Sequence, residues 1–164
     1  MKNYFAIVLL LLTTLGYAQS SLSGLLKKYN SEAIPYITVE ELKQSKNEVI
    51  LLDTRERNEY NVSHLKNAVY AGYDHFNLDS VKKHIPNKNN PIVVYCSLGV
   101  RSEKIGIKLK DAGYTNVKNL YGGIFEWKNQ NNTVYSTKGK QTENVHAYSK
   151  TWSKWLLKGE KIIN

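Results

Sequence analysis

The segment PIVVYCSLGVRS, residues 91–102, contains the single cysteine of this 164-residue chain. The four residues before Cys96 are apolar and mostly β-branched, which predicts a buried strand that ends at the cysteine. A short loop that includes Gly99 follows, and Arg101 and Ser102 open a helix. The sequence therefore predicts that the thiol lies at the carboxyl end of a strand, beside the start of a helix.

Helix and strand patterns alternate on both sides of this segment. Thr38 and Glu41 form a capping box, which predicts a short helix, and the apolar run at residues 49–52 predicts a buried strand. The other expected helices are at residues 56–61, 80–84, 102–112 and 123–127, and the other expected strands at residues 68–70 and 117–120. Strands separated by such helices indicate an α/β fold with a central, mostly parallel sheet and helices on both faces.

The surroundings of Cys96 favour a reactive thiol. In a parallel sheet, ligands bind at the carboxyl ends of the strands. Backbone N–H groups of the loop and of the helix start would converge on the sulfur and stabilise a thiolate. Gly99 allows a φ angle that a side chain would resist. A lone cysteine after an apolar strand is commonly a buried structural residue, but the glycine loop, the arginine and the helix start together favour a nucleophile.

Three ordered motifs resemble those of one known family. The loop CSLGVRS, residues 96–102, resembles the active-site loop of the single-domain rhodanese-like sulfurtransferases. Residues 53–68, DTRERNEYNVSHLKNA, resemble the early motif of that family, and residues 113–127, GYTNVKNLYGGIFEW, resemble its late motif. One departure is Ser63, which stands where the early motif usually has glycine. The resemblance covers about residues 35–129 and implies a rhodanese-like domain over that range.

This resemblance implies a chemistry for the loop. Cys96 would take a sulfane sulfur from a small anionic donor such as thiosulfate, hold it as a persulfide, and pass it to cyanide, a thiol or a dithiol protein. The loop amides would stabilise the persulfide, Arg101 would orient the donor, and no metal or cofactor would take part. The implied substrate-binding residues are Ser97, Leu98, Gly99, Val100, Arg101 and Ser102.

Three further polar residues lie near the expected site. Asp53 and Arg55 end a predicted strand, and the resemblance implies that they support the loops rather than act in the chemistry. His64 could act as a base in a Cys–His hydrolase, but the sequence offers no identifiable Asn or Asp partner. The family motif gives this histidine a structural role.

Two other functions remain open. Cysteine phosphatases also have an anion-binding loop that ends in arginine, but they have five residues between cysteine and arginine, whereas four separate Cys96 from Arg101 here. The smaller ring of amides suits a single sulfur atom better than a phosphoryl group. The domain could also be a persulfide carrier or a partner-binding module with little turnover.

The first 18 residues have the pattern of a signal peptide. Lys2 precedes an apolar run, and small residues at positions 16 and 18 predict cleavage after Ala18. The run is shorter than a bilayer requires, which disfavours a membrane anchor, so no stable membrane span is expected after cleavage. We therefore expect an exported protein, periplasmic or secreted, with residues 19–34 as a lead-in to the domain.

The remaining segment, residues 130–164, is basic and contains two tryptophans. A hairpin is expected around Gly139, and the spacing of Trp152, Trp155 and Leu156 predicts a short amphipathic helix that packs on the domain. The chain has a formal net charge of +9. No nucleic-acid motif accompanies this charge, so we expect a solvated surface and no nucleic-acid partner.

Overall fold

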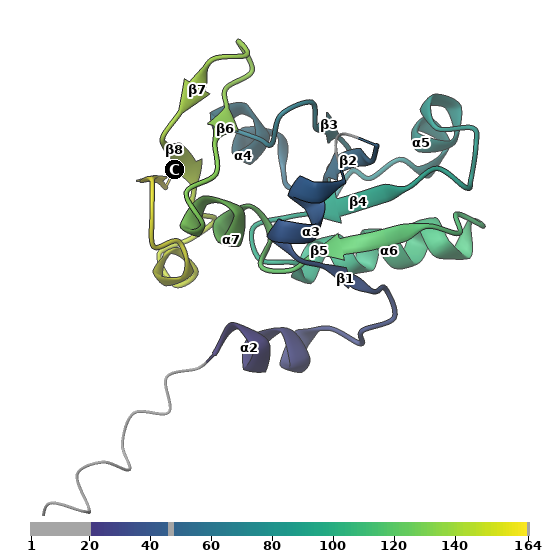
Figure 1. Cartoon of the computed structure of the whole chain (residues 1–164), viewed down its shortest axis with the longest axis horizontal. Helices are drawn as coiled ribbons and strands as arrows, with labels where there is room; N and C mark the ends of the chain where they lie inside the picture. The colour runs from purple at the N-terminus through teal and green to yellow at the C-terminus, as the bar shows by residue number, and fades with distance from the viewer. Residues whose placement is uncertain (1–20, 46–47, 164) are drawn as a thin grey trace, which may run out of the picture.

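The computed structural model describes residues 21–45 and 48–163, and a five-stranded sheet lies at its centre (Figure 1). The strands lie in the order β1-β5-β4-β2-β3, and all their pairings are parallel. This arrangement confirms the predicted parallel sheet. The strand bounds are Tyr36–Ile37 (β1), Ile50–Asp53 (β2), Val69–Tyr70 (β3), Ile92–Tyr95 (β4) and Val117–Leu120 (β5).

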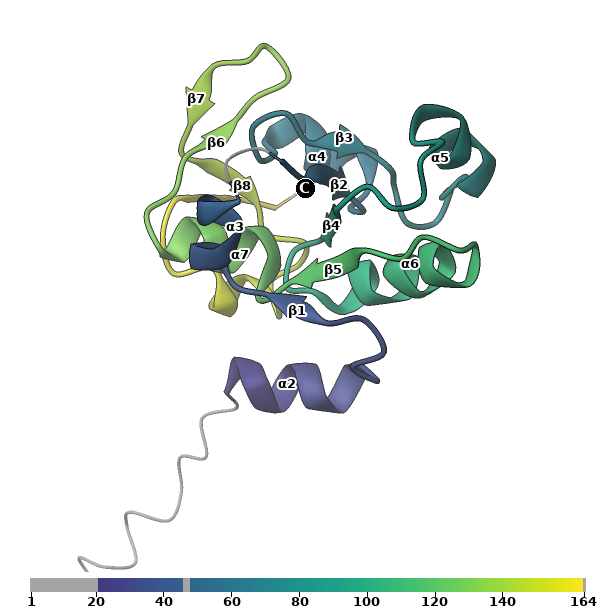
Figure 2. The same ribbon diagram turned by 45° about the vertical axis from the view of Figure 1, so that its right-hand side comes forward.

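The central strand β4 is buried on both faces of the sheet. Val93 and Tyr95 enter one apolar cluster, and Ile92 and Val94 enter another. Helices cover both clusters, as predicted (Figures 1 and 2). On the first face lie α3 (Val39–Gln44) and α7 (Gly123–Asn129), and on the second lie α5 (Leu78–His84) and α6 (Val100–Asp111). A strand packed in this way needs apolar residues at every position, which explains its continuous apolar run.

The register of the sheet brings two strand ends together. Asp53, the last residue of β2, is the partner of Tyr95, the last residue of β4. Thr54 continues the pairing by donating its N–H to the carbonyl of Tyr95 at 2.9 Å. The segments that follow β2 and β4 therefore leave the sheet side by side, and α4 (Arg57–Val62) follows the first of them.

The helix after Cys96 begins slightly earlier than the sequence pattern predicts. It starts at Val100, because Gly99 takes the N-cap position with φ 109°, in the left-handed region. The expected opening at Arg101 and Ser102 was therefore one to two residues too late. The earlier start places Arg101 within the first turn of α6, close to the sulfur.

The lead-in contains a helix that the sequence analysis missed. This helix, α2 (Leu22–Tyr29), is capped by Ser21, whose hydroxyl accepts the N–H of Gly24 at 3.0 Å. Leu26 on α2 is buried. Asn30, directly after the helix, donates its side-chain N–H to the carbonyl of Gly99 at 3.0 Å. The lead-in thus contacts the loop that follows Cys96.

The segment after residue 129 holds four short strands. The expected hairpin is confirmed: β6 (Val134–Tyr135) pairs antiparallel with β7 (Gln141–Thr142). A second pair, β8 (Asn144–His146) and β9 (Glu160–Ile162), is parallel.

The predicted amphipathic helix around Trp152 was wrong, because only a three-residue 3-10 turn forms, η2 (Ser153–Trp155). The N–H groups of Leu157 and Lys158 instead bond to the side-chain oxygen of Asn129 at 2.7 and 3.3 Å. These bonds hold the chain against the end of α7 and prevent the turn from continuing as a helix.

This C-terminal extension, residues 130–163 in the structure, packs on the domain. Val145, Ala147 and Leu156 are fully buried in the same apolar cluster as Val93 and Phe125.

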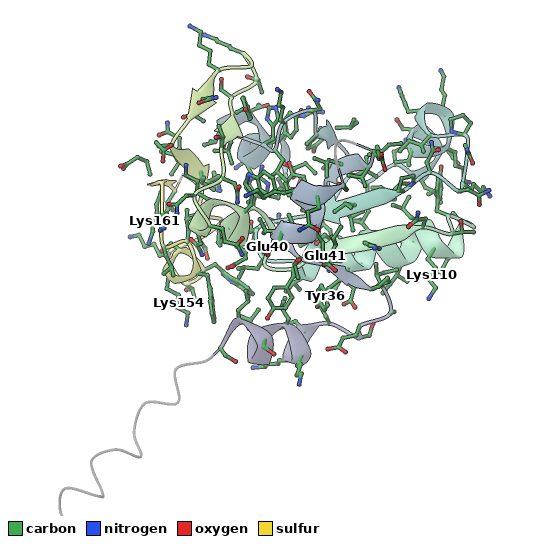
Figure 3. All side chains as sticks on the ribbon, in the orientation of Figure 1. Tyr36, Glu40, Glu41, Lys110, Lys154 and Lys161 are labelled. Carbon is green, nitrogen blue, oxygen red and sulfur yellow. The ribbon has the colours of Figure 1, made fainter. Side chains whose placement is uncertain are left out.

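The lysines of the extension are exposed, in contrast to these apolar residues. Lys128, just before it, is buried and paired with Glu143 at 2.7 Å. The lysines at positions 138, 140, 150, 154, 158 and 161 are exposed, and Figure 3 shows Lys154 and Lys161 pointing away from the domain.

The proposed signal peptide, residues 1–18, lies outside the described residues, so its cleavage and the exported location stay predictions. Among residues 21–45 and 48–163, no helix is long and apolar enough to cross a membrane.

Candidate active site

Cys96 follows β4 at the carboxyl edge of the sheet, as the sequence predicts. Its side chain is only 2% exposed. The N–H of Gly99 donates to the sulfur at 3.1 Å, and the hydroxyl of Ser102 lies 3.5 Å from it. The sulfur therefore faces hydrogen-bond donors from the loop and from the first turn of α6.

Side chains from two distant elements hold the loop in this orientation. Asn119 on β5 donates to the carbonyl of Gly99 at 2.8 Å, and its amide oxygen lies 2.7 Å from the hydroxyl of Ser102. Asn30 donates to the same carbonyl of Gly99. The carbonyl of Gly99 thus points away from the sulfur while its N–H group points toward it. Asn119 lies within the late motif, but no local sequence pattern indicates this role.

The start of α7 engages two more loop carbonyls. Ile124 donates its N–H to the carbonyl of Cys96 at 2.9 Å, and Phe125 donates to the carbonyl of Ser97 at 3.1 Å. This close approach requires glycine at position 123, because a Cβ there would lie 2.3 Å from the oxygen of Cys96. The carbonyls of Cys96, Ser97 and Gly99 are therefore all hydrogen-bonded to groups outside the loop.

The electrostatic surroundings favour the thiolate of Cys96. Burial alone would raise the pKa of the thiol. The charge of Arg101 and the hydrogen bonds from Ser102 and from the N–H of Gly99 outweigh burial, so the pKa of Cys96 is lowered. A thiol with a lowered pKa supplies more nucleophile near neutral pH.

Arg101 forms a bidentate ion pair that the sequence analysis did not predict. Its two terminal nitrogens donate to the carboxylate of Glu59 at 2.6 and 2.8 Å, and one of them also donates to the hydroxyl of Ser97 at 3.1 Å. Glu59 is 2% exposed and lies on α4. The guanidinium expected to orient the donor therefore has its charge balanced by a buried carboxylate. The only sequence signal for Glu59 was its place in the early motif.

Asp53 and Arg55 form a fully buried ion pair beside the site. The guanidinium of Arg55 donates to the carboxylate of Asp53 at 2.7 Å and to the carbonyl of Ser63 at 2.6 Å. The pair thus joins the end of β2 to the end of α4, in keeping with the supporting role implied by the resemblance. Ser63 has an extended backbone with φ −168°, so this position does not need the glycine that the motif usually has.

His64 makes its contacts away from Cys96. Its Nδ1–H donates to the carbonyl of Tyr60 at 3.2 Å, and its ring stacks on the ring of Tyr60 with centroids 4.1 Å apart. These contacts agree with a structural role and give no support to a Cys–His pair.

A cavity of about 100 Å³ opens above the thiol. Its walls include two aromatic residues of the C-terminal extension, Tyr148 and Trp152, which the sequence analysis did not place at the site. The ring of Tyr148 covers the guanidinium of Arg101, with 4.6 Å between the ring centroid and Cζ. The full set of lining residues is Cys96, Ser97, Leu98, Val100, Arg101, Tyr148 and Trp152.

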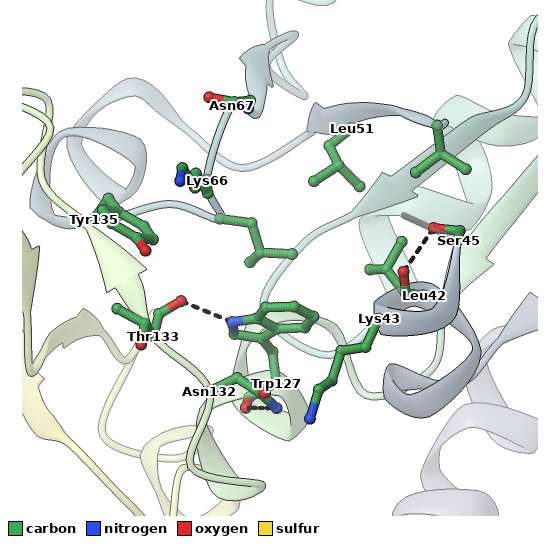
Figure 4. A pocket seen from close by; sticks show the side chains of 12 residues that line it. Leu42, Lys43, Ser45, Leu51, Lys66, Asn67, Trp127, Asn132, Thr133 and Tyr135 are labelled. Atoms are coloured by element: carbon green, nitrogen blue, oxygen red, sulfur yellow. Dashed lines mark hydrogen bonds between the residues drawn. The ribbon is translucent and has the colours of Figure 1, made fainter. Parts of the chain in front are cut away.

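A second cavity, of about 430 Å³, opens beside Trp127 (Figure 4). Trp127 forms part of its wall and donates its indole N–H to the carbonyl of Thr133 at 2.9 Å. Lys43 and Lys66 also line this cavity, but its described lining includes no cysteine, histidine or carboxylate and no residue of the loop 96–102. The nucleophile Cys96 and Arg101 therefore line the smaller cavity and not this one.

Comparisons with known proteins show which family the chain resembles. The family model described as Rhodanese-like domain matches residues 38–130. A tRNA uridine(34) hydroxylase of Aster yellows witches'-broom phytoplasma is 36% identical over 103 residues, which cover 56% of this chain and 32% of that protein. A thiosulfate sulfurtransferase, GlpE, of Coxiella burnetii is 29% identical over 83 residues, which cover 51% of this chain and 75% of that protein. This chain thus spans only about a third of the length of the hydroxylase.

Solved structures show the same fold. The crystal structure of a thiosulfate sulfurtransferase from Pseudomonas aeruginosa superposes with a TM-score of 0.58 at 20% identity, covering 75% of this chain and 23% of that one. The rhodanese-like domain of an Anabaena protein gives a TM-score of 0.56 at 24% identity, covering 62% of this chain and 79% of that one. Tyr148 and Trp152 lie beyond the residues that the family model matches.

Proposed function

Because the chain belongs to the family of rhodanese-like domains, we propose that it is a sulfurtransferase that carries sulfane sulfur as a persulfide on Cys96. The observation that carries the proposal is the position of the sulfur of Cys96, which lies 3.1 Å from the N–H of Gly99 and has a lowered pKa. Such a thiol is a ready nucleophile toward a sulfur–sulfur bond.

In the proposed first step, the thiolate of Cys96 attacks the outer sulfur of thiosulfate. The sulfur–sulfur bond of the donor breaks, its electron pair leaves with sulfite, and the outer sulfur stays on Cys96 as a persulfide. The backbone N–H groups of Gly99 and Ser102 stabilise the negative charge on sulfur, while the hydroxyl of Ser102 donates to the amide oxygen of Asn119 at 2.7 Å. A separate general base is not required, because the lowered pKa of Cys96 favours the thiolate and sulfite is a good leaving group.

In the second step, an acceptor thiolate or cyanide attacks the outer sulfur of the persulfide. The bond to Cys96 breaks, and the thiolate of Cys96 returns to its first state. A small thiol or a dithiol protein is the acceptor class that we propose. In an oxidising compartment, a reductant or partner thiol is also needed to restore Cys96 after oxidation.

The phosphatase alternative has less support. Four residues separate Cys96 from Arg101 instead of the five of the phosphatases, and three of the N–H groups of Arg101 are already bonded to Glu59 and Ser97. The carrier alternative is favoured by one observation, the near-complete burial of Cys96. A carrier would accept one sulfur atom and turn over slowly, whereas an enzyme would turn over many donor molecules per thiol.

Mass spectrometry of the intact protein after thiosulfate treatment tests the proposal. We expect the unaltered protein to gain the mass of one sulfur atom, and Cys96→Ser to gain none while keeping its fold. Repeated turnover with thiosulfate and cyanide separates an enzyme from a carrier, and an aryl phosphate serves as the phosphatase substrate. Normal sulfur transfer by Cys96→Ser would show that the proposal is wrong.

A further inference from the structure

We infer that Tyr148 and Trp152 make the site select monoanionic sulfur donors that carry a small apolar group, such as short alkyl thiosulfonates, over the dianion thiosulfate. This inference rests on the proposed sulfurtransferase function and specifies its donor. It concerns two residues of the C-terminal extension, outside the segment that the family model matches.

The first observation is the charge of the cavity. Of the described residues that line it, Arg101 alone carries a formal positive charge. Both terminal nitrogens of that guanidinium are bound to the buried carboxylate of Glu59, and the ring of Tyr148 covers it. Because the charge of Arg101 is balanced by Glu59, the amide donors around the sulfur remain to stabilise an anion, and they stabilise one negative charge. A second negative charge on the donor would lose its hydration in the cavity without meeting a cation that is free to pair with it. This loss of hydration is unfavourable.

The second observation is the apolar wall. Tyr148 and Trp152 line the cavity together with Leu98 and Val100. The two aromatic rings meet edge to face with centroids 6.2 Å apart. A donor whose outer end is a methyl or short alkyl group would gain apolar contact here, whereas a charged oxygen would not.

Neighbouring contacts hold both aromatic residues in place. The N–H of Tyr148 donates to Nδ1 of His146 at 3.1 Å, and Tyr148 has φ 64°. Trp152 packs on the ring of Tyr29 from α2, with centroids 6.1 Å apart. The wall is therefore supported by α2 and β8 as well as by the contact between Tyr148 and Arg101.

The size of the cavity suits a small apolar group. The volume is about 100 Å³, whereas an engineered apolar cavity that binds benzene is about 150 Å³. A methyl or ethyl group therefore fits within the volume above the thiol.

Methanethiosulfonate and thiosulfate form a matched pair of donors. They differ in that a methyl group on the central sulfur of the first replaces a charged oxygen of the second. With methanethiosulfonate, the thiolate of Cys96 attacks the outer sulfur, the sulfur–sulfur bond breaks, and its electron pair leaves with methanesulfinate. The products carry the same total charge as the reactants, and no proton, oxidant or reductant is consumed.

The experiment compares kcat/KM for the two donors with the same acceptor and pH. Each value is divided by the rate constant of that donor with free cysteine, which removes the intrinsic difference in reactivity. We expect the corrected ratio to favour methanethiosulfonate by roughly tenfold, which corresponds to one good apolar contact. A corrected ratio below about threefold would overturn the inference while leaving the sulfurtransferase function intact.

Substitutions then test whether the two aromatic residues cause the preference. Tyr148→Asn removes the ring at a position where Asn tolerates the left-handed backbone, and Trp152→Gln removes the other. We expect each variant to lose roughly threefold or more of the preference, through a higher KM for methanethiosulfonate rather than a lower kcat. The matched controls are Tyr135→Asn and Trp155→Gln, which alter aromatic residues of the same extension that do not line this cavity.

The outcomes distinguish the two proposals. Equal preference in Tyr148→Asn, Trp152→Gln and the unaltered protein would overturn the role of the aromatic wall. Failure of both donors to add sulfur to Cys96, seen by intact mass, would overturn the proposed function and this inference with it.

Discussion

The guanidinium of Arg101 lies on the carboxylate of Glu59, with nitrogen–oxygen distances of 2.6 and 2.8 Å. This contact joins the first turn of α6 to α4 through two residues that are 42 positions apart in the sequence. It therefore links the stability of the domain to the charge beside the nucleophile, and both can be measured.

Glu59→Gln is expected to make stability less dependent on acid pH. Burial would raise the pKa of Glu59, but the hydrogen bonds and charge of Arg101 outweigh burial and lower it. The pair therefore stabilises the fold fully above the ordinary pKa of 4.5, and this contribution is lost as the pH falls below that value. Near neutral pH we expect Glu59→Gln to cost about 3 kcal/mol of unfolding free energy.

Urea unfolding at several pH values measures this effect. Below pH 4.5, the free energy of Glu59→Gln should fall less steeply than that of the unaltered protein. Glu40→Gln, an exposed change on α3, is the control and should stay within about 0.5 kcal/mol of the unaltered protein. An unchanged slope in Glu59→Gln would argue against the pair as a source of acid sensitivity.

Arg101→Gln is expected to raise the pKa of Cys96. Burial raises this pKa, and the charge of Arg101 is the largest of the effects that lower it. Removing the charge also leaves the carboxylate of Glu59 near the thiol. The pH profile of alkylation by iodoacetamide reports the thiolate, so its midpoint should move to higher pH in the variant. Lys104→Gln, on the exposed side of the same helix, should leave the midpoint where it is.

Gly99→Ala is expected to impair sulfur transfer. Gly99 has φ 109°, a backbone conformation that residues with a side chain rarely adopt, so alanine would strain the backbone and move the N–H that faces the sulfur. Loss of one aligned donor should lower kcat/KM roughly 10-fold to 100-fold. Gly139→Ala is the matched control, because it also has positive φ, at 71°, but no atom within 4 Å of the added group. Equal activity of the two variants would contradict the role of the Gly99 amide.

Leu156→Ala tests the packing of the C-terminal extension. Leu156 is fully buried, so its truncation should cost about 3 kcal/mol of unfolding free energy. The neighbouring Leu157 is 75% exposed, and Leu157→Ala should change stability by less than about 0.5 kcal/mol. Thermal or urea unfolding of the two variants gives the comparison. Similar stabilities would mean that the extension adds little to the core.

The sequence predicts the sheet and the loop because their signals are local. The apolar run before Cys96 and the glycine after it are adjacent in the chain, and both strand and loop form where expected. The contact between Glu59 and Arg101 joins two elements whose relative position depends on the whole sheet, so no short pattern reports it. The helix expected around Trp152 does not form. The side chain of Asn129, which is distant in the sequence, instead accepts hydrogen bonds from the backbone N–H groups of Leu157 and Lys158.

Tyr148 and Trp152 show more clearly that local sequence patterns do not report contacts between distant segments. Tyr148 reaches Arg101 only because the extension returns across the domain through β8 and β9. The side chains of Tyr148 and Trp152 could pack against many residues, and the sequence alone does not indicate which residues they contact. The missed helix α2 has a similar cause, since it is short and contains glycine, yet Asn30 at its end bonds to the loop.

The carbonyls of Cys96, Ser97 and Gly99 are all engaged by α7, Asn119 and Asn30 before any donor arrives. The peptide units around the thiol are thus oriented in advance, so we expect one sulfur atom to be added or removed with little backbone movement. The reorganisation energy of the loop is then small, as in a preorganised electrostatic site. We therefore expect the temperature dependence of turnover to change with the leaving group of the donor. It should not reflect an opening motion of the loop.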